Sequence, residues 1–249
     1  MYDFSGKTAI ITGGNSGIGL ETAKKMKAAG ANLAICGLSD EKLKKATAVL
    51  GGDVITRSVD MTAVPQIETF VSEVARHFGK VDVVVAAAGG AVVRPFHRMD
   101  EDLFDHDLGR NFKGAYFTAK FATPHMKNGG SLVFLGSAAG SRGFPGMSVY
   151  GPSKSALRSL VRVLAAELSV NNIRANLVSP GPIPTPGMDR LGLPDAELQQ
   201  AKAGFEAMVP LGRMGTTGNV ADTILFLASD AASYVTGSEI PVDGGMAQV

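Results

Sequence analysis

The sequence predicts an α/β fold of three layers (α/β/α), in which a doubly wound parallel sheet lies between two layers of helices. Short β-branched runs alternate with longer segments of helical period along the whole chain. The runs are largely apolar, as are strands that are buried on both faces. Because crossovers between parallel strands are right-handed, this alternation indicates a single Rossmann-type domain.

Each element follows from its pattern. The β-branched runs place strands at residues 7–12, 32–36, 53–59, 81–87, 131–137, 173–179 and 239–242. Segments with the helical period place helices at residues 19–30, 40–50, 67–78, 156–169 and 220–229, with a further, largely helical stretch at 101–121. Gly30 ends the first helix, and Ser39 caps the second ahead of the acids Asp40 and Glu41.

Composition limits the class of protein. The 249 residues suit one α/β domain, and neither a repeat nor a low-complexity linker divides them. A formal net charge of +1 gives no electrostatic basis for binding nucleic acid or an anionic membrane. The single cysteine, Cys36, suits a reducing compartment. No signal peptide and no membrane span is expected, so a soluble, cytoplasmic protein is the default.

One region interrupts the alternation of strands and helices. Residues 181–215 are rich in Pro, Gly and Met and directly follow the carboxyl end of a predicted strand. That position favours a segment that covers a substrate over a plain surface excursion. Apolar residues that we expect as candidates for the wall of a substrate pocket are Phe144, Met147, Met188, Leu191, Leu193, Phe205 and Met208.

A glycine-rich turn, "TGGNSGIG" at residues 12–19, joins the first strand to the first helix. Gly13, Gly17 and Gly19 give it the spacing G-x-x-x-G-x-G. Glycine permits a positive φ and a close approach of a ligand to the backbone, and N–H groups at the start of the helix point at an anion. A glycine-rich turn can be no more than a turn, but this position favours a site for a pyrophosphate.

The end of the second strand carries no residue that clearly distinguishes NAD from NADP at the adenosine ribose. An acid there would bind a 2′-hydroxyl and an arginine a 2′-phosphate, whereas this chain has Gly37 and Leu38. Ser39 and the free N–H groups of the next helix are able to hold a phosphate, which favours NADP over NAD. Asp60, at the end of the third strand, either accepts a hydrogen bond from an adenine amino group or caps the following helix.

Tyr150 and Lys154 lie four positions apart in the stretch "SVYGPSKSALRSL", so both project from one face of a helix. Pairs of this kind also occur on solvated surfaces. Two further residues favour a site: Ser137 follows the strand "SLVFLG", at the edge where such sheets bind ligands, and Asn111 is a polar interruption of a helical segment.

Together these residues resemble the classical short-chain dehydrogenase/reductase family. The motifs that carry the resemblance span nearly the whole chain: "TGGNSGIG", Asp60, "AAAG" at 86–89, Asn111, Ser137, Tyr150 with Lys154, "SPGPIPT" at 179–185 and "PVDGG" at 241–245. The resemblance implies a catalytic tetrad of Asn111, Ser137, Tyr150 and Lys154, with NAD or NADP as cofactor. It also implies cofactor contacts from Gly13, Asn15, Ser16, Gly17, Ile18, Gly19, Leu38, Ser39, Asp60, Met61, Ala88, Gly89, Tyr150, Lys154, Pro180, Gly181, Ile183 and Thr185.

The residue types suit that chemistry. Adding hydride to a carbonyl leaves an alkoxide, which needs a proton from a nearby acid. A free tyrosine has a pKa of about 10, and a neighbouring ammonium together with a positive nicotinamide would lower it. Lys154 supplies the ammonium, and Ser137 is able to donate to the substrate oxygen. By resemblance, Lys154 also holds the nicotinamide ribose, and Asn111 positions a water that links the lysine to solvent.

Two departures from the family pattern stand out. Ala86 and Ala87 replace asparagines that brace the central strand in the family, so another contact has to replace them. Gly37 and Leu38 leave the choice between NAD and NADP open. The four histidines, His77, His97, His106 and His125, show no spacing typical of metal ligands, and no metal site is expected.

Three functions are compatible with these residues. The first is an NAD(P)-dependent short-chain alcohol dehydrogenase or carbonyl reductase that interconverts a secondary alcohol and a ketone. The second is a non-catalytic dinucleotide-binding sensor or scaffold, and the third is an epimerase or dehydratase that regenerates its cofactor. The complete tetrad favours the first. By resemblance the protein is a homotetramer whose interfaces involve residues 101–121, 150–169 and 241–249.

Overall fold

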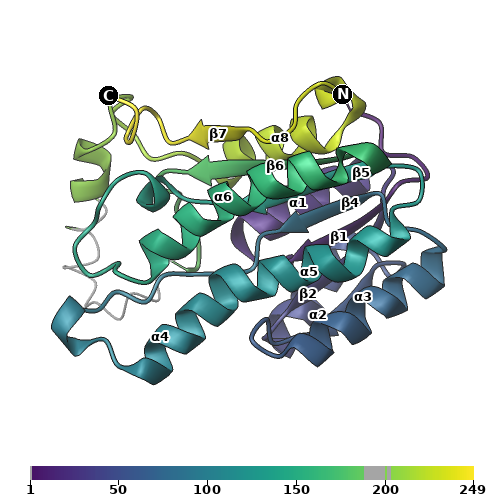
Figure 1. The fold of residues 1–249 in the computed structure, drawn as a ribbon, viewed down its shortest axis with the longest axis horizontal. Helices are drawn as coiled ribbons and strands as arrows, with labels where there is room; N and C mark the ends of the chain where they lie inside the picture. The colour runs from purple at the N-terminus through teal and green to yellow at the C-terminus, as the bar shows by residue number, and fades with distance from the viewer. Residues whose placement is uncertain (1, 188–199, 201–202) are drawn as a thin grey trace.

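The computed structural model describes residues 2–187, 200 and 203–249, and within these ranges seven strands form one parallel sheet (Figure 1). The order across the sheet is β3-β2-β1-β4-β5-β6-β7. The strands are β1 Thr8–Thr12, β2 Asn32–Gly37, β3 Ile55–Ser58, β4 Val83–Ala86, β5 Gly130–Leu135, β6 Ile173–Pro180 and β7 Glu239–Val242.

The order of the strands creates a crevice. From β1 the chain adds strands outward to β3, and it then returns to the other side of β1 and continues from β4 to β7. The direction therefore reverses between β1 and β4, which pair in parallel from Ala9 with Val83 to Thr12 with Ala86. Ligands of such sheets bind at the carboxyl ends of the strands beside this reversal.

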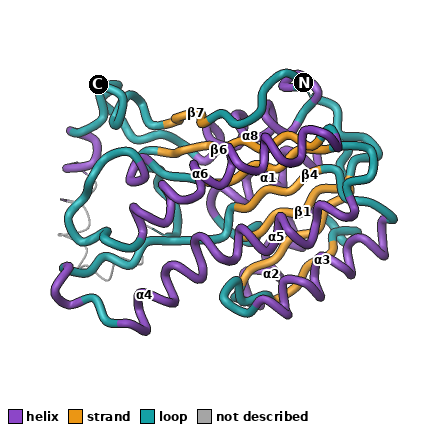
Figure 2. Tube along the Cα trace, viewed as in Figure 1, coloured by secondary structure: helices purple, strands orange, loops and turns teal. Residues whose placement is uncertain are grey.

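Helices cover both faces of the sheet, as Figure 2 shows, and Figure 1 looks onto the face covered by α3, α5 and α6. The helices are α1 Gly17–Ala28, α2 Asp40–Leu50, α3 Val64–Phe78, α4 Glu101–Leu108, α5 Gly114–Ala122, α6 Tyr150–Leu168 and α8 Thr217–Ala228. Short 3₁₀ turns occur at Phe96–Arg98, Thr123–His125, Ala138–Gly140, Ser169–Asn171 and Asp230–Ala232. None of the helices in the described ranges is both long and apolar enough to cross a membrane.

The core has two halves, one on each face of the sheet. Successive residues of a strand point to opposite faces, so Ile10 packs with α3, α5 and α6, whereas Ile11 packs with α1, α2 and α8. Both side chains are fully buried. This two-sided burial explains why the strands read as apolar runs and not as an alternation of apolar and polar residues.

The predicted fold class is confirmed, and the predicted elements are present with local differences in their bounds. The segment at 101–121 is not one helix, because a π-helical turn, Gly109–Lys113, separates α4 from α5 and contains Asn111. α6 begins at Tyr150, ahead of the stretch of clear helical period at 156–169, as the expectation that Tyr150 and Lys154 share a helix requires; the first turn of a helix tolerates Pro152. β3 is shorter than predicted; it is an edge strand and only partly buried.

Candidate active site

A cavity of about 420 Å³ opens at the carboxyl edge of the sheet. Its walls come from the loops that follow β1 to β6 and from the first turns of α6. Every residue expected from the sequence to contact a cofactor lines this cavity, and so does Ser137. The fourth member of the expected tetrad, Asn111, is fully buried just behind the wall.

The glycine-rich turn forms a narrow cradle at the start of α1. Gly13 has a φ of +68°, and a Cβ there would lie 2.9 Å from the Cα of Ala88. A Cβ on Gly19 would lie 2.4 Å from the carbonyl oxygen of Gly13. Ser16, the N-cap residue, makes no capping hydrogen bond with its side chain, so the first N–H groups of α1 face the cavity without that partner. This cradle fits a pyrophosphate.

The end of β2 adds a polar corner beside the cradle. Gly37 lets the side chain of Asn15 pack against the end of β2, since a Cβ there would lie 2.3 Å from Nδ2 of Asn15. Ser39 caps α2 as predicted, and its Oγ accepts a hydrogen bond from the backbone N–H of Lys42 at 3.3 Å. Lys42, on the first turn of α2, also lines the cavity, which places a cation beside Ser39 and Leu38.

Asp60 stabilises the turn ahead of α3, but it is not the cap of that helix. Its Oδ1 accepts hydrogen bonds from the backbone N–H and the hydroxyl of Thr62, both at 2.8 Å, in an Asx-type turn. The N-cap residue of α3 is Ala63. The interpretation of Asp60 as a helix cap is therefore wrong, and the residue lines the cavity.

The end of β4 is braced without the asparagines that are usual in the family. The hydroxyl of Thr12, at the end of β1, accepts a hydrogen bond from the backbone N–H of Ala88 at 3.1 Å. One residue beyond Gly89, the backbone N–H of Gly90 donates to Oδ1 of Asn111 at 3.0 Å. These two contacts hold the loop to the neighbouring strand and to the π-helical turn, so Ala86 and Ala87 need no polar side chain.

Tyr150, Lys154 and Ser137 lie together on the cavity wall. The pair on α6 shares one face: Nζ of Lys154 lies 5.6 Å from the centroid of the Tyr150 ring. Nζ also donates a hydrogen bond to the carbonyl oxygen of Leu135 at 2.8 Å, which fixes the lysine to the end of β5. Ser137, two residues beyond β5, accepts from the backbone N–H of Ala139 at 3.2 Å.

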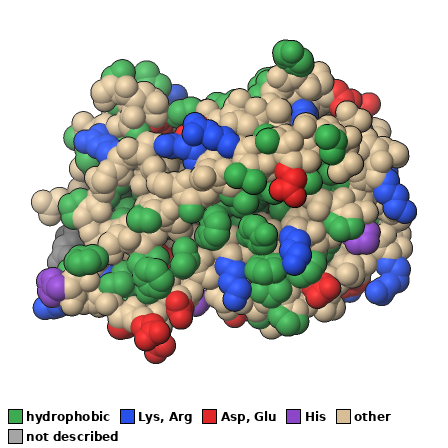
Figure 3. Space-filling view, viewed as in Figure 1, with side chains coloured by type: hydrophobic (Ala, Val, Ile, Leu, Met, Phe, Trp, Pro, Cys, Tyr) green, Lys and Arg blue, Asp and Glu red, His purple; other side chains and the backbone are tan. Residues whose placement is uncertain are grey.

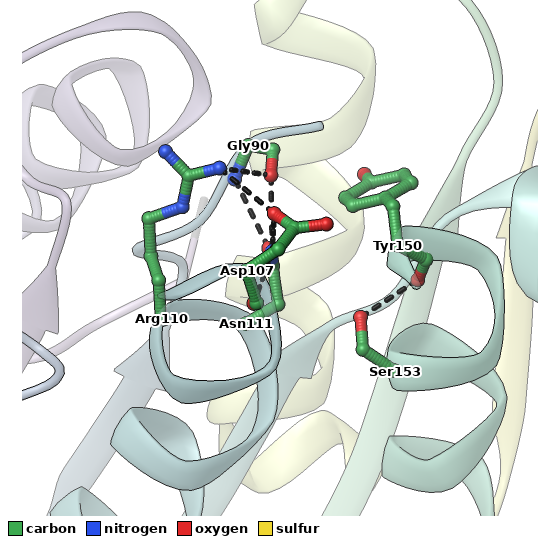
Figure 4. A network of polar contacts seen from close by, with 6 residues as sticks. All are labelled: Gly90, Asp107, Arg110, Asn111, Tyr150 and Ser153. Atoms are coloured by element: carbon green, nitrogen blue, oxygen red, sulfur yellow. Dashed lines mark hydrogen bonds and ion pairs between the residues drawn. The ribbon is translucent and has the colours of Figure 1, made fainter. Parts of the chain in front are cut away.

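Asn111 is held in the π-helical turn by four hydrogen bonds (Figure 4). Its Nδ2 donates to the carbonyl oxygens of Gly90 and Asp107 and to Oδ1 of Asp107, at 3.0, 2.9 and 2.9 Å, and its Oδ1 accepts from the N–H of Gly90. A Cβ on Gly89 would meet both Oδ1 of Asn111, at 2.5 Å, and Nζ of Lys154, at 3.4 Å. The side chains of Asn111 and Lys154 therefore both lie close to Gly89.

The electrostatics of the pair differ from the sequence-based expectation. Burial raises the pKa of Tyr150; a hydrogen bond with Ser137 opposes the rise, Asp107 adds to it, and Arg110 opposes it. Burial lowers the pKa of Lys154 to about 8, with Asp107 opposing and Arg110 reinforcing that change. In the protein alone the expected lowering of the tyrosine pKa is not found, because burial outweighs the hydrogen bond with Ser137 and the positive charge of Arg110.

Part of the cavity wall is apolar. Phe144, Met147 and Phe205 line it, as expected, together with Met246 from the C-terminal segment. Met208 does not line the cavity and is about a third exposed. Three of the expected pocket residues, Met188, Leu191 and Leu193, lie outside the described ranges. Of the segment expected to cover the substrate, residues 181–183, 185–187 and 205 line the cavity.

Comparison with known proteins defines the class. Residues 13–247 match the family described as enoyl-(acyl carrier protein) reductase. Oxidoreductase asL5 of Sarocladium schorii is 38% identical over 98% of this chain and 97% of its own length. The 3-oxoacyl-(acyl-carrier-protein) reductase FabG of Thermotoga maritima is 36% identical over 97% of this chain and 98% of its own.

Comparison with solved structures indicates the same family as comparison with sequences. The structure of a short-chain dehydrogenase/reductase, glucose/ribitol dehydrogenase, from Brucella melitensis has a TM-score of 0.92 and 34% identity, and the match covers 100% of this chain and 99% of that one. The chain therefore belongs to the classical short-chain dehydrogenase/reductase family and is an oxidoreductase. Members of this family use NAD or NADP.

Among the residues of the cavity wall or of its support that were not singled out from the sequence, four have charged or sulfur-containing side chains. They are Lys42, Asp107, Arg110 and Met246. Asp107 precedes Asn111 by four positions, so the helical period alone would have placed the two on one face. Met246 carried no such signal, since only the tertiary fold brings the C-terminal segment to the cavity.

Proposed function

We propose that the protein interconverts a secondary alcohol and a ketone by hydride transfer with NADP or NAD. One observation carries the proposal: Tyr150, Lys154 and Ser137 lie on the wall of the same cavity as the glycine cradle. A bound nicotinamide supplies or accepts the hydride. The protein contributes the groups that bind the substrate oxygen and move its proton.

Each member of the tetrad has a distinct task in this proposal. The hydroxyl of Ser137 donates a hydrogen bond to the substrate oxygen and stabilises the charge that develops on it. Tyr150 gives that oxygen a proton during reduction and takes the proton back during oxidation. Lys154, fixed by the carbonyl of Leu135, supports the phenolate and binds the ribose. Asn111, which also lies close to Gly89, positions water that returns the proton to the pair.

The raised pKa of Tyr150 fits a proton donor in the reducing direction. For oxidation the phenol has to lose its proton, and the protein alone does not promote this. The positive charge of an oxidised nicotinamide beside the ring would favour the phenolate. We therefore expect Tyr150 to be the acid when the protein binds reduced cofactor and the base when it binds oxidised cofactor.

The polar corner after β2 supports a preference for NADP. Lys42 and Ser39 line the cavity beside Leu38, at the start of α2, where N–H groups also attract an anion. A lysine there is able to pair with a 2′-phosphate as a point charge. Asp60, at the neighbouring end of β3, lines the same cavity, and we expect it to accept a hydrogen bond from adenine.

The apolar lining residues support an apolar carbonyl substrate. Phe144, Met147 and Phe205 line the same cavity as Tyr150. FabG of Thermotoga maritima is named for 3-oxoacyl reduction, and a keto group on a flexible acyl chain would suit such a wall. We expect small polar ketones to be poorer substrates than ketones with a longer apolar chain.

We also propose that the protein is a homotetramer that buries the face shown in Figure 3. Hydrophobic side chains gather near the middle of this face, over α5 and α6. Phe104 of α4, Tyr116 of α5 and Val163 of α6 are 44%, 40% and 55% exposed. An exposed apolar patch of this kind is typical of an association surface.

A panel of ketones and alcohols tests the function directly. Reduced or oxidised cofactor is supplied, and the absorbance of the reduced nicotinamide is followed. We expect turnover of at least one apolar ketone. Tight cofactor binding without turnover of any substrate would favour the sensor or scaffold. Products that form without a net change in absorbance would favour an epimerase or dehydratase instead.

A further inference from the structure

A buried acid stands next to the proposed tetrad. Asp107, the next-to-last residue of α4, has a fully buried side chain. Its Oδ1 accepts hydrogen bonds from Nδ2 of Asn111 at 2.9 Å and from Nη2 of Arg110 at 3.0 Å. Its Oδ2 is buried and has no hydrogen-bond partner in the described part of the chain. In Figure 4 this second oxygen points away from Arg110, toward the side on which Tyr150 lies.

Arg110 connects the acid to the cavity. Its Nη2 also donates to the carbonyl oxygen of Gly90 at 2.6 Å, the same carbonyl that accepts from Asn111. The arginine lines the cavity, and its side chain is 25% exposed. Asp107 and Arg110 thus form an ion pair beside the Gly89–Gly90 loop, to which both Asn111 and Lys154 lie close. Burying a charged pair is costly, so burial alone does not explain why the pair is here.

The two members of the ion pair have opposite effects on the pKa values of the neighbouring tyrosine and lysine. Asp107 raises the pKa of both Tyr150 and Lys154, and Arg110 lowers both. In the described ranges, the titratable or charged groups that face Asp107 are Arg110 from the same segment and Tyr150 and Lys154 from α6. His106, the residue before Asp107, is exposed and lines the cavity. Neutralising one member of the pair leaves the other uncompensated.

We propose that Asp107 is a positioning residue of the proton-transfer site: its carboxylate fixes the amide of Asn111 against Gly90, and with Arg110 it holds a balanced pair of charges beside Tyr150 and Lys154. This inference rests on the proposed function, because it assigns the pair to the proposed proton transfer. It gives the same buried pair two effects that are separable by experiment, one geometric and one electrostatic.

Two variants separate the effects of the two charges. Asp107→Asn keeps the size of the side chain and an oxygen that accepts from Asn111, but it leaves Arg110 uncompensated. Arg110→Gln leaves the carboxylate uncompensated. With a saturating oxidised cofactor, kcat/KM for alcohol oxidation is measured as a function of pH, and the acidic limb of this profile reports the pKa of the Tyr150 phenol. We expect that limb to move by about one pH unit, to lower pH in Asp107→Asn and to higher pH in Arg110→Gln. The double variant should lie near the unmodified protein.

Asp107→Ala tests the geometric effect. It removes the acceptor for Asn111 as well as the charge, so kcat should fall at least about tenfold below that of Asp107→Asn, with KM little changed. Equal kcat in the two variants would overturn the positioning of Asn111. Limbs that move in the same direction in Asp107→Asn and Arg110→Gln, or that do not move, would overturn the electrostatic effect.

A second readout needs no turnover. The ultraviolet absorbance of phenolate is titrated for each charge variant and for the same variant with Tyr150→Phe, and the difference gives the titration of Tyr150. We expect the order Asp107→Asn, unmodified protein, Arg110→Gln, from low to high pKa. That order without any turnover would retain the inference about the charges and reject the proposed function. Identical titrations would reject the inference even in an active enzyme.

Discussion

The ammonium of Lys154 lies 5.6 Å from the centre of the Tyr150 ring, and its hydrogen bond to the carbonyl of Leu135 holds it there. The lysine is therefore anchored to the sheet, and the tyrosine, one helical turn before it, is carried by the same helix. A movement of α6 would displace both groups together. Because both groups are on one helix, the distance between the Lys154 ammonium and the Tyr150 ring at the cavity wall stays constant.

Replacing Gly19 by alanine should weaken cofactor binding at least about tenfold, which corresponds to about 1.4 kcal/mol. The new Cβ would lie 2.4 Å from the carbonyl oxygen of Gly13, so the cradle has to change shape. Calorimetric titration with NADP and with NAD measures the effect. The control is Gly52→Ala, where a Cβ meets nothing within 4 Å. Equal affinities in the two variants would contradict the cradle.

Lys42→Ala should weaken NADP binding by about tenfold and leave NAD binding within about twofold, since only NADP carries the 2′-phosphate. The control is Lys45→Ala on the same helix, whose ammonium pairs with Glu41 at 2.6 Å on the exposed side. Dissociation constants of both cofactors are compared for the three proteins. A parallel loss of NAD and NADP affinity in Lys42→Ala would reject the phosphate contact.

The buried Lys154 predicts a particular dependence of stability on pH. Its pKa is lowered from 10.5 to about 8. Below about pH 8 both folded and unfolded chains hold the proton, so the cost of burial is constant. Above that pH the folded chain releases the proton first, and stability rises with pH until the unfolded chain releases it as well.

Lys154→Met lacks this titration. The unfolding free energy of the unmodified protein relative to Lys154→Met should therefore rise between about pH 8 and pH 10, by up to about 2 kcal/mol. Urea titrations across this range measure the difference, with the exposed Lys45→Met as the control for losing a lysine. A difference that stays flat or falls over this range would show that burial does not depress the pKa of Lys154.

Val163→Glu should dissociate the proposed tetramer, because it places a charge in the apolar patch over α5 and α6. Light scattering at micromolar concentration gives the mass of the particle. Val170→Glu is the control, since Val170 is 83% exposed in the 3₁₀ turn that follows α6. The proposal fails if the unmodified protein is already a monomer, or if both variants keep the same mass as it.

The fold could be predicted from the sequence because buried positions are apolar and recur with the period of each strand or helix. Strands covered on both faces become apolar runs, and helices covered on one face take the helical period, so β1 and α2 lie at or within one residue of their predicted ranges. The edge strand β3 is shorter than predicted, because its partial exposure weakens the apolar pattern that marks a strand.

The candidate site was only partly predictable. Ser137 and Tyr150 could be placed because parallel strands bring their carboxyl ends to one edge, and a motif marks each. Asp107 and Arg110 could not be assigned, because the helical period gives the face of a helix but not the loop that this face meets. The pKa of Tyr150 depends on burial, which the spacing of two residues does not contain.

The most direct test of the account is the turnover of Tyr150→Phe, measured together with its affinity for the cofactor. The change removes the phenol oxygen and leaves the ring. We predict that kcat falls by roughly 10² to 10⁴-fold while the dissociation constant of the cofactor stays within about twofold, and that Tyr234→Phe, on the exposed surface, keeps full activity. Unchanged turnover in Tyr150→Phe would contradict the assignment of Tyr150 as the acid and base of the reaction.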